Sequence, residues 1–165
     1  MVNVNKNITK VCSFYVSDWH FITMLLPHVS KSIDAGVKIA TILEKNSQEK
    51  VEELLNKVKI PKKEEIINIG WKEKNINEEN IKNIINKFET KGEIIISGTN
   101  KYIEEVNTII NYYMEENNIQ KQIKVINCYF VEENFNVNKV LEKHDLVLNT
   151  SGEKTTREFL DTVNF

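Results

Sequence analysis

The sequence lacks any apolar run that could cross a membrane. A transmembrane helix needs about 20 consecutive, mostly apolar residues, and no stretch of the chain approaches this length. The N-terminal segment MVNVNKNITK also lacks the apolar centre of a secretory signal peptide. We therefore expect a cytoplasmic protein with no membrane partner.

Cysteine is scarce, and neither sign of charge is in excess. Cys12 and Cys128 are the only cysteines and lie far apart in apolar runs, so we expect buried thiols rather than a disulfide or metal ligands. The 22 Lys and Arg residues against 24 Asp and Glu residues give a formal net charge of -2. This balance argues against a nucleic-acid-binding surface, because such surfaces are strongly basic.

The usual sequence signatures of catalysis are missing. The chain has no GxSxG, HExxH or CxxC motif, and its three histidines do not cluster. We expect His28, which follows Pro27, to lie on the surface or at an interface, and His144 to lie at the opposite end of the sheet from any ligand crevice. Nothing in the chain requires an enzyme, and we assign no catalytic residue, no cofactor and no metal.

What the chain does contain is an alternating series of apolar strands and amphipathic helices. We predict strands at residues 11–16, 37–43, 64–71, 92–97, 122–131 and 145–150. We predict helices at residues 18–35, 47–58, 77–88, 100–116, 137–142 and 157–163. Ser17 or Asp18 is expected to cap the first helix and Gly36 to end it. Because Pro27 lies inside this helix, we expect a kink or a break near Leu26.

The apolar content of the strands predicts how the sheet is arranged. Strands that are almost continuously apolar are buried on both faces, which is typical of a parallel sheet covered by helices on either side. The length of 165 residues suits one domain. We therefore predict that residues 1–165 form a single three-layer α/β domain with a mostly parallel sheet of about six strands, whose order the pattern leaves open.

In such a sheet, ligands bind in a crevice beyond the carboxyl ends of the strands. The candidate ligand-binding residues follow the first, third and fourth predicted strands: Ser17, Asp18, Trp19, His20, Trp71, Gly98, Thr99 and Asn100. Trp19 and Trp71 could form an apolar wall for a small organic ligand, or simply cover the open end of the sheet. Asp18 beside His20 could serve acid–base chemistry, but a helix cap explains Asp18 better, because no nucleophile accompanies the pair.

A phosphate-binding loop is absent after the first strand, where the turn at Ser17 and Asp18 has no glycine and no lysine. The nearest imitation is SGEKTT at residues 151–156, but the first glycine of the motif is missing and Glu153 would repel a phosphate. SGTNKY at residues 97–102 is explained by a tight turn at Gly98 and a helix cap at Thr99 or Asn100.

Two long segments resemble a known family. KVCSFYVSDWHFITMLLPHVSKSIDAGVKIATIL resembles the start of the MEDS domain, a sensory domain named from methanogens, methylotrophs and the dichloromethane repressor. INCYFVEENFNVNKVLEKHDLVLNTSG resembles its closing segment, so the resemblance covers about residues 8–152. The matching residues are Cys12, Phe14, Tyr15, Pro27, Gly36, Tyr113, Asn117, Cys128, Phe135, Leu141, His144, Leu146 and Val147. Lys10 replaces a histidine of the family pattern, Met114 a glutamate and Asp145 a proline.

The resemblance implies a RecA/KaiC-like α/β domain that has lost the Walker A phosphate loop, in agreement with the glycine-free turn after the first strand. It also implies a role in signal sensing, with small hydrocarbon derivatives as ligands and with kinases or DNA-binding domains as common attachments. Ligand chemistry that depends on the family's histidine is not expected here, because Lys10 stands in its place.

Together, these features predict a non-catalytic signal-sensing or regulatory domain. We expect it to bind a small-molecule ligand or a regulatory protein partner at the carboxyl edge of the sheet, and to pass its state on through a protein partner or a homo-oligomer. The alternative is a degenerate nucleotide-binding protein with weak ATPase or phosphotransfer activity, which requires Mg²⁺-dependent ATP binding that Lys154→Ala abolishes. A DNA-binding regulator is disfavoured by the balanced charge and by the lack of a compact helix-turn-helix.

Overall fold

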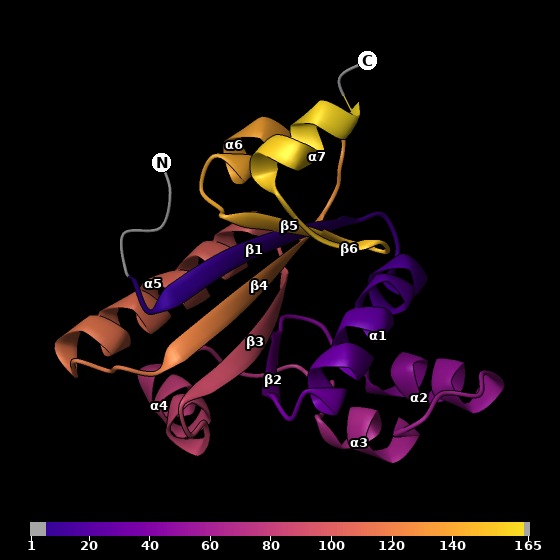
Figure 1. The fold of residues 1–165 in the computed structure, drawn as a ribbon, viewed down its shortest axis with the longest axis horizontal. Coiled ribbons are helices and arrows are strands. Elements are labelled where there is room, and N and C mark those ends of the chain that lie inside the picture. Colours follow the sequence, from indigo (N-terminus) through magenta and orange to yellow (C-terminus); the bar gives the residue numbers. More distant parts are fainter. Residues whose placement is uncertain (1–5, 164–165) are drawn as a thin grey trace.

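The computed structural model describes residues 6–163, which form an α/β fold around one sheet (Figure 1). The strands are β1 (Ile8–Tyr15), β2 (Lys38–Leu43), β3 (Lys91–Gly98), β4 (Gln122–Phe130), β5 (Leu146–Asn149) and β6 (Gly152–Thr155). The helices are α1 (Asp18–Asp34), α2 (Gln48–Lys57), α3 (Lys63–Asn68), α4 (Glu78–Lys87), α5 (Asn100–Glu116), α6 (Val137–Leu141) and α7 (Thr156–Val163). Within the described residues, no helix is both long enough and apolar enough to span a membrane.

The sheet is mixed rather than fully parallel. Its strands follow the order β2-β3-β4-β1-β5-β6, and the first five of these run parallel to their neighbours. β6 pairs antiparallel with β5, because the two strands are joined by a tight turn at Thr150 and Ser151. β1 and β4 pair along their whole length, from Ile8 opposite Ile123 to Tyr15 opposite Phe130, so both strands end at the same edge.

One predicted strand is wrong, and one strand was not predicted. Residues 64–71 were expected to form a strand, but α3 occupies most of this segment, and only Ile66 of this helix is fully buried. A run of apolar residues this short fits either a strand or a helix, so periodicity does not separate the two. The sixth strand is instead β6, in the SGEKTT segment that was expected to form a loop.

Helices cover both faces of the sheet and create two cores. One core joins the sheet to α1, α2 and α3, and contains the fully buried Leu25, Leu55 and Ile66. The other joins the sheet to α4, α5 and α6, and contains Ile85, Ile110 and Leu141. Figure 1 shows α1, α2 and α3 grouped on one side of the strands and α5 on the other. The described residues therefore have the three-layer arrangement that the apolar strands predicted.

α1 begins at the carboxyl edge of β1, and its cap is Ser17; the interpretation of Asp18 as the cap is wrong, because Asp18 is the first helical residue and pairs with Lys50. The Ser17 side chain accepts a hydrogen bond from the backbone N–H of His20, and Gly36 follows the helix with a positive φ of 77°. Of the two alternatives expected near Leu26, a kink or a break, the break is wrong, because α1 runs without interruption through Pro27. Pro27 and Thr23, whose carbonyl loses its helical partner there, are both exposed. Water can therefore hydrogen bond to this carbonyl.

Candidate functional site

The connections that leave β1 and β4 go to opposite faces of the sheet. β1 leads into α1, which packs on one face, whereas β4 leads toward α6, which packs on the other. Neighbouring parallel strands whose connections diverge in this way leave a crevice at their carboxyl ends. A cleft of about 490 Å³ opens at this edge, lined by residues from the ends of β1, β2, β3 and β4.

Five of the eight residues proposed from the sequence line this cleft: Ser17, Asp18, Gly98, Thr99 and Asn100. The first two form the turn between β1 and α1, and the other three form the junction between β3 and α5. Because β1 and β3 are separated only by β4 in the sheet, two turns far apart in the sequence face the same space.

The other three proposed residues do not line the cleft. Trp71 is only 1% exposed, and its Nε1–H donates to the backbone carbonyl of Ile66 at 2.9 Å. It therefore packs in the core beneath α3 and does not form a wall of the cleft. Trp19 is 41% exposed on the first turn of α1, outside the cleft lining. His20 accepts a hydrogen bond from the backbone N–H of Val16 through Nδ1 at 3.0 Å, and so stabilises the turn before the helix.

Four aromatic residues that the sequence reasoning missed line the cleft: Tyr15, Phe21, Phe130 and Phe135. The ring centroid of Tyr15 lies 5.0 Å from that of Phe21 and 5.6 Å from that of Phe130, so these three rings form a continuous wall. Tyr15 and Phe130 are the last residues of β1 and β4. Their position at strand ends was a usable signal, but both belong to apolar runs and resemble core residues.

The two helix N-termini at the cleft are capped by the protein's own side chains. The Thr99 side chain accepts a hydrogen bond from the backbone N–H of Tyr102, much as Ser17 caps α1. The Glu44 carboxylate, at the end of β2, accepts a hydrogen bond from the backbone N–H of Thr99 at 2.8 Å. An anion bound at this helix end would compete with Glu44 for the same donor.

Gly98 lets the Glu44 carboxylate approach the backbone closely. It does not serve the tight turn that was expected at this position. Its φ is not positive, unlike those of Gly36, Gly70 and Gly152. A Cβ atom at residue 98 would lie 2.8 Å from both Glu44 Oε1 and a ring carbon of Tyr102. The missing side chain therefore makes room for the Glu44 carboxylate, which accepts a hydrogen bond from the Thr99 N–H just before α5.

The hydroxyl groups at the floor of the cleft are not activated. The Tyr15 and Ser97 hydroxyls lie 3.0 Å apart, and both residues are 8% exposed. Burial raises the pKa of Tyr15 above its usual value, although the hydrogen bond with Ser97 acts in the opposite direction. Tyr102 lies outside the cleft lining, and its hydroxyl donates to the backbone carbonyl of Lys74. Burial also raises the pKa of Tyr102 to about 12, with a contribution from the charge of Glu44. These phenols stay protonated at neutral pH, so they can donate hydrogen bonds but do not act as bases.

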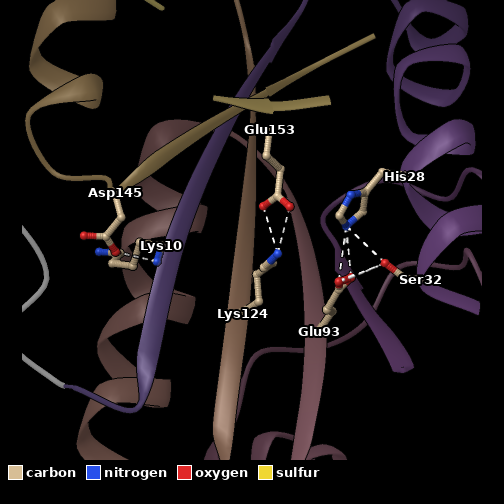
Figure 2. Close-up of polar contacts among 7 residues, drawn as sticks. All are labelled: Lys10, His28, Ser32, Glu93, Lys124, Asp145 and Glu153. Carbon is tan, nitrogen blue, oxygen red and sulfur yellow. Dashed lines mark hydrogen bonds and ion pairs between the residues drawn. The ribbon is translucent and has the colours of Figure 1, made fainter. Parts of the chain in front are cut away.

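A second polar group lies within the interior, away from the cleft (Figure 2). His28 and Ser32 of α1 both contact Glu93 of β3: His28 Nε2 lies 2.9 Å from Oε1, and the Ser32 hydroxyl donates to the same oxygen at 2.7 Å. The expectation of a surface or interface role for His28 is therefore wrong, since its side chain is only 9% exposed. Pro27 precedes it on the exposed side of the helix, whereas His28 points toward the sheet.

In the part of the chain that the structure describes, neither the cysteines nor the histidines form a metal site. Cys12 and Cys128 are buried free thiols, as predicted, and burial raises the pKa of each. Among residues 6–163, no group of three or more His, Cys, Asp and Glu side chains is arranged to hold a metal ion.

The fold and the cleft define an α/β protein with an aromatic-walled crevice at the carboxyl edge of a mixed sheet. The chain matches no known family model, no curated protein sequence and no solved structure.

Proposed function

We propose that the protein is a non-catalytic signal-sensing or regulatory domain that binds a small molecule in the cleft at the carboxyl edge of its sheet. The observation that carries this proposal is the cleft itself, with its aromatic wall. Its volume of about 490 Å³ falls within the range of roughly 300–1,000 Å³ typical of small-molecule sites. Such sites combine an apolar lining with a few hydrogen-bonding groups, and this cleft has both.

The chemistry of the lining supports binding rather than catalysis. Among the described residues that line the cleft there is no histidine and no cysteine. The buried hydroxyls of Tyr15 and Ser97 bond to each other. A nucleophile needs a neighbouring base or a lowered pKa, whereas the pKa of Tyr15 is raised.

The resemblance to the MEDS domain supports the same proposal and extends it to a RecA/KaiC-like fold without a phosphate loop. The turn after β1 is capped by Ser17 and has no glycine, as expected for such a domain. Within residues 6–163, no contact favours the nucleotide-binding alternative. Lys154 lies on β6 outside the cleft lining, and Glu153 beside it pairs with Lys124 at 2.9 Å (Figure 2).

A ligand screen tests the proposal. The melting temperature should be measured with a panel of small apolar and halogenated metabolites, and with ATP plus Mg²⁺. A ligand that binds only the folded state raises the melting temperature according to its saturation. We expect apolar small molecules to stabilise the protein and Phe130→Ala to abolish that effect, because Phe130 forms the accessible end of the aromatic wall.

Tyr112→Ala is the matched control for this variant. Tyr112 is also an exposed aromatic residue, but it lies on α5 and does not line the cleft. Stabilisation should therefore persist in Tyr112→Ala. Stabilisation by ATP and Mg²⁺ that Lys154→Ala removes would replace the sensor proposal with the nucleotide-binding alternative.

A further inference from the structure

The cleft combines an aromatic wall with an excess of negative charge. Its charged lining residues are three carboxylates, Asp18, Glu44 and Glu132, and one ammonium group, Lys45. Asp18 forms an ion pair with Lys50 of α2, which reduces its contribution. Glu44 is exposed, and its carboxylate accepts a hydrogen bond from the neutral backbone N–H of Thr99.

The position of Glu44 matters more than the number of carboxylates. The N-terminus of a helix carries a partial positive charge and is the natural anchor for an anion. At α5 a carboxylate already lies at this place, because Glu44 Oε1 accepts the hydrogen bond of the N–H of Thr99, the N-cap residue. An anionic ligand would have to displace this carboxylate or lie beside it, and either arrangement is unfavourable.

The negative field reaches the aromatic wall. Asp18 and Glu44 both contribute to the raised pKa of Tyr15, after burial as the main cause, so their charges act at the floor of the cleft. The faces of aromatic rings also attract cations, most strongly where water is excluded. Tyr15, Phe21 and Phe130 therefore favour the same sign of charge as the carboxylates do.

We infer that the cleft selects an organic cation: a small molecule with a flat apolar body and an ammonium group. The apolar body packs against the Tyr15, Phe21 and Phe130 wall, and the ammonium group lies toward Glu44. This inference rests on the proposed function, because it names the ligand class of the same cleft. It excludes phosphates and carboxylates as preferred ligands.

A charge series of matched probes tests this inference. The probes are 2-phenylethylamine as the cation, 2-phenylethanol as the neutral molecule and phenylacetate as the anion. Binding is followed in the full chain through the amide NMR signals of residues 16–19 and 98–101, which report on the two turns at the cleft. We expect the cation to bind about tenfold more tightly than the neutral probe, and the anion to bind most weakly. Among the three probes, added salt should weaken the binding of the cation alone.

Two isosteric variants assign the preference to the cleft. Glu44→Gln keeps an acceptor for the Thr99 N–H but removes the charge, so the preference for the cation should fall to about threefold or less. Glu116→Gln makes the same change at the far end of α5 and should leave the preference intact. An equal effect of both variants would overturn the assignment of the preference to Glu44.

The outcomes separate this inference from the proposed function. Tighter binding of the neutral or anionic probe at the same amides would refute the cation preference and leave the small-molecule cleft in place. If no probe moves those amides and the broader ligand screen also finds nothing, both proposals are wrong.

Discussion

His144 is the centre of a buried hydrogen-bond network on the α5 and α6 side of the sheet. Its Nδ1 lies 2.6 Å from the backbone carbonyl of Val140, so Nδ1 carries the proton and donates it. Its Nε2 accepts from the Asn127 side-chain amide at 3.0 Å. Asn107 completes the chain by donating to Asn127 Oδ1 at 2.8 Å. The neutral imidazole therefore satisfies this network, whereas a proton on Nε2 would face the donor of Asn127.

This network predicts a loss of stability in mild acid. Burial lowers the pKa of His144 to about 4. Between this value and the unfolded pKa of about 6.5, the unfolded chain binds a proton that the folded chain does not, so stability falls as the pH falls. The full effect amounts to about 3 kcal/mol between pH 6.5 and pH 4. Denaturant unfolding across this pH range measures it.

His144→Gln should flatten that pH dependence, whatever it does to stability at neutral pH. Glutamine keeps hydrogen-bonding groups but does not titrate. The quantity to compare is the slope of unfolding free energy against pH in the two proteins. An unchanged slope would show that His144 is not the group that takes up the proton.

At the scale of elements, the contact between α1 and β3 depends on Glu93. Burial acts to raise the pKa of this carboxyl, but the hydrogen bond and the charge of His28 outweigh it, with Ser32 adding to them, so the pKa is lowered. A lowered pKa means that ionised Glu93 stabilises the fold above its unfolded pKa, and that this stabilisation disappears as the pH falls through the folded pKa.

Glu93→Ala should destabilise the protein by about 3 kcal/mol, because it leaves His28 and Ser32 without their shared buried partner. Glu93→Gln should cost less, since its carbonyl oxygen can still accept from Ser32. Chemical denaturation at pH 7 measures both. Glu116→Ala, at an exposed position on α5, serves as the control and should change stability by less than about 0.5 kcal/mol. Equal stability of Glu93→Ala and this control would mean that α1 is held by apolar packing alone.

At the scale of the whole molecule, the two cores share a single sheet. Ile94 and Ile96 of β3 point into the core beneath α4 and α5, while Ile95 between them points into the core beneath α1 and α2. Because both cores pack against this sheet, unfolding of the sheet from one core also exposes the other core. The described residues should therefore unfold in one cooperative step.

A mutation in one core should therefore also lower the unfolding midpoint that is measured in the other core. Ile110→Ala removes a side chain that is 1% exposed in the core beneath α5 and should cost about 2–5 kcal/mol. In a Trp19→Phe background, the fluorescence of Trp71 reports on the opposite core. The unfolding midpoint followed by Trp71 fluorescence should fall together with the midpoint followed by circular dichroism. Two separate transitions would show that the two faces unfold independently.

The regular elements were largely predictable from the sequence. The helix at residues 100–116 and the apolar runs of β3 and β4 have strong periodicity and clear ends, so their limits agree with the structure to within a residue or two. The segment around Ile66 was not predictable, because its short apolar run fits both a strand and a helix. β6 was missed because its alternation of half-buried and exposed residues is too short to separate from a turn.

The sequence alone determined the alternation of elements, the burial of the strands and the capped turn at Ser17, because these depend on residues close together in the chain. Only the tertiary structure decided which strand ends meet, and hence that Glu44, Thr99 and Tyr15 share one cleft. The tertiary structure also decided that the side chains of Trp71 and His28 lie in the interior. These contacts join residues tens of positions apart, and their geometry depends on strand order and on which face each helix covers, which local patterns do not encode.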